Sequence, residues 1–116
     1  MNTVTSKEGT KIAYDKQGAG PVVILVDGAL CTRSFGSKPE LIKLLAPHFT
    51  VYSYDRRGRG DSGDTKPYAV EREVNDIEAL IDEAGEAVYI YGHSSGAAHA
   101  LETTMRLANK IKKLAM

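Results

Sequence analysis

The sequence lacks several features that would place a protein in a broad class. It has a single cysteine, Cys31, which excludes an internal disulfide framework and indicates a reducing compartment, so we expect a cytoplasmic protein. Neither charge sign is in excess, because 15 lysines and arginines balance 15 aspartates and glutamates. This balance gives no electrostatic reason to bind nucleic acid or an anionic membrane surface. No apolar run is long enough to span a bilayer, and the first residues lack the basic and apolar segments of a secretory signal.

The composition that is present fits a single globular domain over residues 1–116. Hydrophobic residues make up 42% of the chain and charged residues 26%, which excludes a disordered chain and a coiled coil. A length of 116 residues is enough for one domain and too little for two.

Apolar segments alternate along the chain in a way that predicts an α/β fold. Residues 3–17 are expected to form a β-hairpin around Glu8-Gly9. Short apolar runs predict central strands at residues 22–26, 50–54, 87–91 and 111–116. Helices are predicted at residues 39–46, 70–84 and 97–107, from apolar residues that recur every three or four positions and from capping signals. The order predicts a mainly parallel sheet with helices on both faces, joined by right-handed crossovers.

The motif that carries chemistry is Gly92-His93-Ser94-Ser95-Gly96, between a predicted strand and a predicted helix. It matches G-x-S-x-G, in which the central residue occupies a strained turn with its side chain above the sheet. Small residues are needed at Gly92 and Gly96 because strand and helix approach too closely there for a side chain. The alternative is a glycine- and serine-rich loop without a reaction. The strand–corner–helix context favours the nucleophile elbow.

Two further segments occur in order with this elbow: the strand and turn of residues 22–28, and the loop Asp55-Arg56-Arg57-Gly58-Arg59-Gly60-Asp61-Ser62. Together the three motifs resemble the N-terminal half of an α/β-hydrolase of the esterase and haloperoxidase-like group. Residues 22–28 are similar to the strand that leads to the oxyanion loop, and residues 55–62 to the family's D-x-R-G-x-G-x-S loop. The resemblance covers almost the whole chain and implies a truncated α/β-hydrolase fold.

The resemblance implies a serine-dependent carboxylic-ester hydrolase that acts on a small-molecule ester without a cofactor or metal. Ser94 would be the nucleophile, and the backbone N–H groups of Ser95 and Ala29 would hold the oxyanion. The family usually has His-Gly where this chain has Asp27-Gly28, so a negative charge stands near the oxyanion position unless Asp27 turns away. The residues implied to support the site are Asp27, Gly28, Gly92, His93 and Gly96.

No histidine of the chain is expected to act as the general base. In the family, the acid and the histidine follow the nucleophile, but only 22 residues follow Ser94. His99 lies five positions further along the same helix, so the two side chains diverge by about 140° and are separated by about 7.5 Å along the axis. His99 is expected to pack under the sheet or face solvent, His93 to be structural or pocket-lining, and His48 to be a surface residue.

The chain is therefore interpreted as half of a hydrolase, with weak activity unless a base is supplied in trans. The alternative is a non-catalytic fragment that acts as an oligomeric scaffold or as one half of a complemented enzyme. Haloalkane dehalogenation is disfavoured, because it needs an aspartate where Ser94 stands, whereas haloperoxidase or perhydrolase activity uses the same elbow. The final strand is expected to form an exposed edge that pairs with a second copy, giving a homodimer, or with a missing C-terminal half.

The arginine-rich run Arg56-Arg57-Gly58-Arg59-Gly60 has two interpretations. Arginines and glycine amides suit a phosphate. The resemblance to the family implies instead a structural loop whose arginine and aspartate brace neighbouring turns, and this interpretation is favoured.

Overall fold

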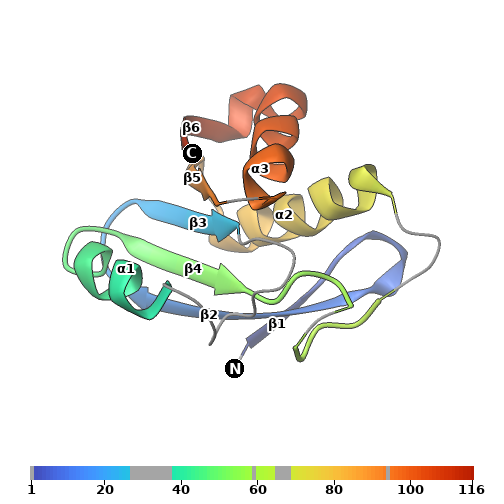
Figure 1. Ribbon diagram of the computed structural model, residues 1–116, viewed down its shortest axis with the longest axis horizontal. Coiled ribbons are helices and arrows are strands. Elements are labelled where there is room, and N and C mark those ends of the chain that lie inside the picture. The colour runs from blue at the N-terminus through green and yellow to red at the C-terminus, as the bar shows by residue number, and fades with distance from the viewer. Residues whose placement is uncertain (1, 27–37, 59, 65–68, 94) are drawn as a thin grey trace.

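The structure is a computed structural model that describes residues 2–26, 38–58, 60–64, 69–93 and 95–116 (Figure 1). It contains one six-stranded sheet with the strand order β1-β2-β4-β3-β5-β6. The strands are β1 (Asn2–Thr5), β2 (Lys11–Gly18), β3 (Val22–Val26), β4 (Thr50–Tyr54), β5 (Val88–Gly92) and β6 (Ile111–Ala115). The helices are α1 (Lys38–Leu45), α2 (Val70–Ala84) and α3 (Ser95–Arg106), with short 3₁₀ turns at Lys7–Gly9 and Ala108–Lys110.

The pairing of the strands confirms the predicted hairpin and the mainly parallel sheet. β1 and β2 pair antiparallel, and β2 continues antiparallel onto β4. β4, β3, β5 and β6 are parallel to one another, with helices in the connections between them. The carboxyl ends of these four strands therefore lie at the same end of the sheet, which is where sites form in open α/β sheets.

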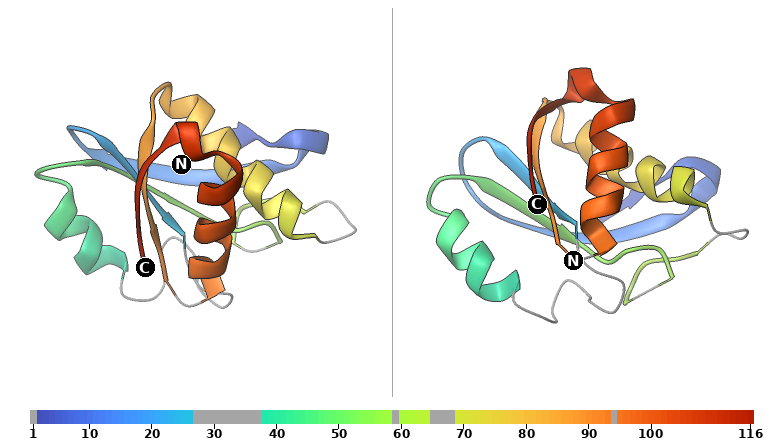
Figure 2. Two further views of the ribbon diagram at one scale, coloured as in Figure 1. Left: turned by 90° about the horizontal axis from the view of Figure 1, so that it is seen from above. Right: turned by 45° about the horizontal axis from the view of Figure 1, so that its top comes forward.

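The sheet is covered on both faces, as the continuous apolar run of β3 predicts. Figures 1 and 2 show α2 and α3 together on one face and α1 on the other. Alternate residues of β3 serve the two faces: Ile24 packs with Ile77 and Leu80 of α2, whereas Leu25 packs with Ile42 of α1. Each face thus has its own hydrophobic cluster.

The helix boundaries agree with the sequence pattern except at the elbow. α2 spans the predicted residues, and Gly85 ends it in a left-handed conformation with φ 75°, donating its N–H to the Ile81 carbonyl. α3 begins at Ser95, two residues before the prediction, because the elbow turns directly into the helix. Among the described segments, no helix combines the length and the apolar character needed to cross a membrane.

Candidate active site

The elbow is a tight corner between β5 and α3. β5 ends at Gly92 and α3 begins at Ser95, so two residues separate strand from helix. The N–H of His93 donates to the Val26 carbonyl at 3.0 Å, and the N–H of Gly96 donates to the His93 carbonyl at 2.9 Å. These bonds fix the corner to the end of β3 and close the first turn of α3.

Gly92 is the residue that this corner constrains most visibly. A Cβ at position 92 would lie 2.6 Å from the Ala97 Cα and 2.8 Å from the Ala100 Cβ. Real Cβ atoms do not approach other atoms this closely, so the strand and helix leave no room for a side chain. The close approach predicted from G-x-S-x-G is therefore confirmed at Gly92, and Gly96 is also buried at the start of α3.

The predicted site residues divide into a described and an undescribed group. Ser94, Asp27, Gly28 and Ala29 lie outside the described residues, as does Cys31. The described members of the predicted site are Gly92, His93, Ser95 and Gly96. Val26 and Gly92 are partners in the parallel register of β3 and β5. The two strands therefore end side by side, and Asp27 and His93 are the next residues along the chain.

Ser95 stands at the positive end of a helix. Because α3 begins at this residue, its backbone N–H has no partner within the helix. The helix dipole adds partial positive charge at the same end. A backbone donor of this kind suits an anion that develops beside the elbow, which is the role predicted for Ser95.

The three histidines lie in different surroundings. His48 is exposed and precedes β4, at the end of the sheet opposite the strand carboxyl ends, as predicted. His93 is also exposed. His99 is buried on α3, with 8% of its surface accessible, and therefore packs in the interior rather than facing solvent.

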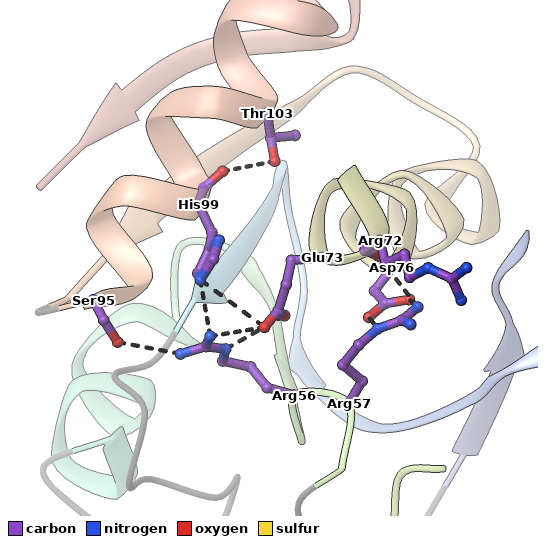
Figure 3. A network of polar contacts seen from close by, with 8 residues as sticks. All are labelled: Arg56, Arg57, Arg72, Glu73, Asp76, Ser95, His99 and Thr103. Carbon is purple, nitrogen blue, oxygen red and sulfur yellow. Dashed lines mark hydrogen bonds and ion pairs between the residues drawn. The ribbon is translucent and has the colours of Figure 1, made fainter. Parts of the chain in front are cut away.

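A buried polar cluster lies beneath the elbow and connects three elements (Figure 3). Arg56, which follows β4, donates from Nη2 to the Glu73 carboxylate of α2 at 2.7 Å and from Nε at 3.4 Å. Its Nη2 also lies 2.8 Å from the His99 Nε2, and its Nη1 donates to the Ser95 Oγ at 3.2 Å. Arg56 thus joins the loop after β4 to both α2 and the first turns of α3.

The contact with Arg56 occupies one ring nitrogen of His99. A guanidinium only donates hydrogen bonds, so the His99 Nε2 must accept with its lone pair. A neutral imidazole that accepts through Nε2 carries its proton on Nδ1. Its basic nitrogen is occupied by Arg56 and is not available to accept a proton from a nucleophile.

A second buried ion pair braces the same loop. Arg57 donates from Nε and Nη2 to the two carboxylate oxygens of Asp76 at 2.8 and 2.7 Å, and from Nη2 to the Arg72 carbonyl at 3.3 Å. Burial raises the pKa of the Asp76 carboxyl, and the hydrogen bonds from Arg57 oppose part of this rise. Hydrogen bonding to Asp76 raises the pKa of Arg57.

These pairs decide between the two interpretations of the arginine-rich run. Arg56 and Arg57 are each 3% exposed and hold carboxylates of α2, so the structural interpretation is confirmed for both and the phosphate cradle is wrong for them. Asp55 contributes to the same bracing, because its side chain accepts the N–H of Asp61 at 2.9 Å. Arg59 lies outside the described residues. The described residues contain no cluster of histidine, cysteine, aspartate or glutamate that could hold a metal ion.

That Glu73, Asp76 and His99 belong to one buried region was not predicted from the sequence. A signal was present, because Glu73 lies on the same helical face as Ile77 and Leu80, which are core residues. An acidic side chain on the apolar face of a helix needs a buried cation. Two arginines in the preceding loop were available to provide it.

Comparison with known proteins gives a consistent set of relatives. The model of the alpha/beta hydrolase family matches residues 22–115. The crystal structure of an alpha/beta hydrolase from Sphaerobacter thermophilus is 53% identical, with a TM-score of 0.91 over 97% of this chain. The epoxide hydrolase VrEH1 from Vigna radiata is 29% identical, with a TM-score of 0.88 over 97% of this chain. The uncharacterized hydrolase YraK of Bacillus subtilis is 31% identical over 106 residues, which are 84% of this chain.

These relatives are considerably longer than the chain. The matched region is 43% of the Sphaerobacter thermophilus protein, 37% of VrEH1 and 37% of YraK. The chain therefore spans about two fifths of their length.

Proposed function

This chain belongs to the α/β-hydrolase family and has its fold, and on that premise we propose that it is a serine-dependent carboxylic-ester hydrolase, or the nucleophile-bearing half of one. The observation that carries the proposal is the absence of room for a side chain at Gly92 against α3. A general βα loop has no need of so close an approach, whereas a nucleophile elbow requires it. In this elbow the residue between His93 and Ser95 is Ser94.

In the proposed reaction, the Ser94 Oγ attacks the acyl carbonyl carbon of an ester and gives its proton to a base. The carbonyl electron pair moves to oxygen, and the resulting oxyanion accepts hydrogen bonds from the N–H groups of Ser95 and Ala29. Collapse of this intermediate expels the alcohol, which takes up a proton. Water then attacks the acyl-enzyme, releases the carboxylic acid and restores Ser94.

The general base is proposed to come from outside the described histidines. His99 is held by Arg56 with its Nε2 occupied, and His48 lies at the opposite end of the sheet. A base supplied by a partner subunit, by a separate C-terminal segment or by solvent would complete the reaction. Without a positioned base, an oxyanion hole and substrate binding alone leave about 10³–10⁴-fold acceleration in a triad-deleted protease, so slow hydrolysis of an activated ester is expected.

A fluorophosphonate probe tests the nucleophile directly. We expect the wild-type chain to form a covalent adduct and Ser94→Ala to form none, with both proteins showing the same circular dichroism spectrum. Digestion and mass spectrometry should locate the adduct on the peptide that contains Ser94. Equal labelling of the two proteins, or labelling of neither, would contradict the assignment of Ser94 as the nucleophile.

A second candidate function, binding a second copy of the chain, is favoured by the edge strand. β6 ends the sheet of the described residues, and an edge strand presents backbone groups for pairing. Beside it lies a hollow of 340 Å³ between α1, β5 and β6, lined mainly by apolar residues such as Leu41, Leu45, Phe49 and Leu114. We propose a homodimer closed across this edge. Light scattering at tens of micromolar should give twice the monomer mass, and a clean monomer would rule the dimer out.

A further inference from the structure

We infer that Arg56 is a positioning residue for the oxyanion side of this site, because its guanidinium holds the first turn of α3 through the Ser95 hydroxyl. The inference rests on the proposed function, in which the Ser95 N–H is an oxyanion donor. Arg56 was not among the site residues predicted from the sequence. Its contacts link the proposed oxyanion donor to α2.

The geometry of Arg56 divides its donors between two helices. The Nε and Nη2 atoms face the Glu73 carboxylate, which sets the plane of the guanidinium from α2. The Nη1 then donates to the Ser95 Oγ at 3.2 Å, while Nη2 lies 2.8 Å from the His99 Nε2 (Figure 3). The guanidinium is rigid and planar, so fixing it on Glu73 also fixes the direction of the donor toward Ser95.

Ser95 and His99 are four residues apart on α3, so they lie on one face of the helix, one turn from each other. Arg56 contacts both residues and therefore bridges the two ends of the first turn of α3. A first helical turn has few internal hydrogen bonds and is where helices fray. The contacts with Arg56 hold this turn from outside the helix. They act at Ser95, whose backbone N–H must keep a fixed direction toward the developing oxyanion.

Arg57 provides a matched comparison within the same loop. It is as buried as Arg56 and also pairs bidentately with a carboxylate of α2. Its hydrogen bonds to Asp76 and to the Arg72 carbonyl both go to α2. Loss of Arg57 should therefore cost stability as loss of Arg56 does, without releasing the first turn of α3.

The test measures the rate of fluorophosphonate labelling of the folded protein, with the folded fraction taken from circular dichroism. Ser95→Ala removes the hydroxyl that accepts from Arg56 and keeps the backbone N–H. We expect about tenfold slower labelling, which is less than the roughly 10²–10³-fold cost of deleting an oxyanion donor. Ser95→Thr keeps a hydroxyl that can accept from Arg56 and should label faster than Ser95→Ala.

Changes at Arg56 show whether this residue acts through Ser95. Arg56→Met should slow labelling about as much as Ser95→Ala, and Arg57→Met should leave the rate of the folded protein unchanged. In the double variant Arg56→Met/Ser95→Ala, the two effects should not add, because both remove the same contact. Exchange of the Gly96 N–H, which bonds to the His93 carbonyl, should become faster in Arg56→Met and stay unchanged in Arg57→Met.

The outcomes separate this inference from the proposed function. Labelling that depends on Ser94 but is unchanged by Ser95→Ala would overturn the positioning role alone. Equal slowing by Arg56→Met and Arg57→Met, or additive effects in the double variant, would show a general structural role and overturn it as well. Absence of Ser94-dependent labelling in the wild-type chain would overturn the proposed function and this inference with it.

Discussion

Arg56 and Glu73 form an ion pair of 2.7 Å in the interior of the protein, with side-chain exposures of 3% and 0%. Burial of two opposite charges together adds little net stability, but removal of one partner leaves the other uncompensated in the interior. The pair therefore makes the junction between the loop after β4 and α2 sensitive to single changes.

Glu73→Gln should destabilise the protein by about 3–5 kcal/mol, because Arg56 would keep its charge and lose its anion. Urea denaturation followed by circular dichroism measures this change. The control is Glu71→Gln two residues earlier, where the carboxylate is exposed and lies 3.4 Å from Arg106. That change should leave the unfolding midpoint nearly unchanged, since exposed ion pairs add little. Similar midpoints for the two variants would contradict the buried-pair account.

Gly92→Ala should damage both the fold and the site. The new Cβ would meet the Ala97 Cα, the Ala100 Cβ and the Gly96 carbonyl oxygen at 2.6–2.9 Å, and two of these three are backbone atoms that cannot rotate away. We expect a loss of about 1–3 kcal/mol and strongly reduced fluorophosphonate labelling, as α3 moves away from β5. Gly63→Ala is the matched control, because its Cβ would lie 3.6 Å from the nearest atom. Wild-type stability and labelling in Gly92→Ala would remove the support for the elbow.

The fold could be predicted from the sequence where local pattern and tertiary environment agree. The apolar spacing of residues 70–84 and the cap at Gly85 define α2, and the apolar run of residues 22–26 defines a strand buried on both faces. The start of α3 was misplaced by two residues, because the small polar residues of the elbow carry no helical periodicity. Tertiary contacts with β3 and β5 decide that boundary.

The polar cluster could not be predicted in the same way. Which carboxylate each arginine of the loop contacts depends on where α2 lies across the sheet, and spacing along the chain does not define this. From the sequence, His99 was expected either to pack under the sheet or to face solvent. The contact with Arg56 decides the question, since it holds the imidazole in the interior.

Alkaline pH should destabilise the protein through Tyr14 and Tyr52. Their rings stack with centroids 5.4 Å apart, and burial, followed by the charge of Glu83, raises the pKa of both phenols above 10.0. Above about pH 10 the unfolded chain loses these protons while the folded chain retains them, so stability falls as pH rises and is unaffected by these groups below that range. Denaturation at a series of pH values measures the slope.

The double variant Tyr14→Phe/Tyr52→Phe should flatten this alkaline fall. It keeps both rings and removes both titrating groups, so the comparison isolates the phenolic protons. An unchanged slope in the double variant would assign the alkaline destabilisation to other groups.

The Arg57–Asp76 pair allows a final test of how buried charges act in this loop. Arg57→Met alone leaves the Asp76 carboxylate without its cation, and Asp76→Leu alone leaves the guanidinium without its anion, so each should cost about 3–5 kcal/mol. The double variant leaves neither charge in the interior, and similar apolar volume replaces the pair. It should therefore be far more stable than the sum of the single losses suggests, close to the wild type. Additive losses in urea denaturation would instead mean that both side chains stabilise the loop chiefly through separate contacts, such as the bond from Arg57 to the Arg72 carbonyl.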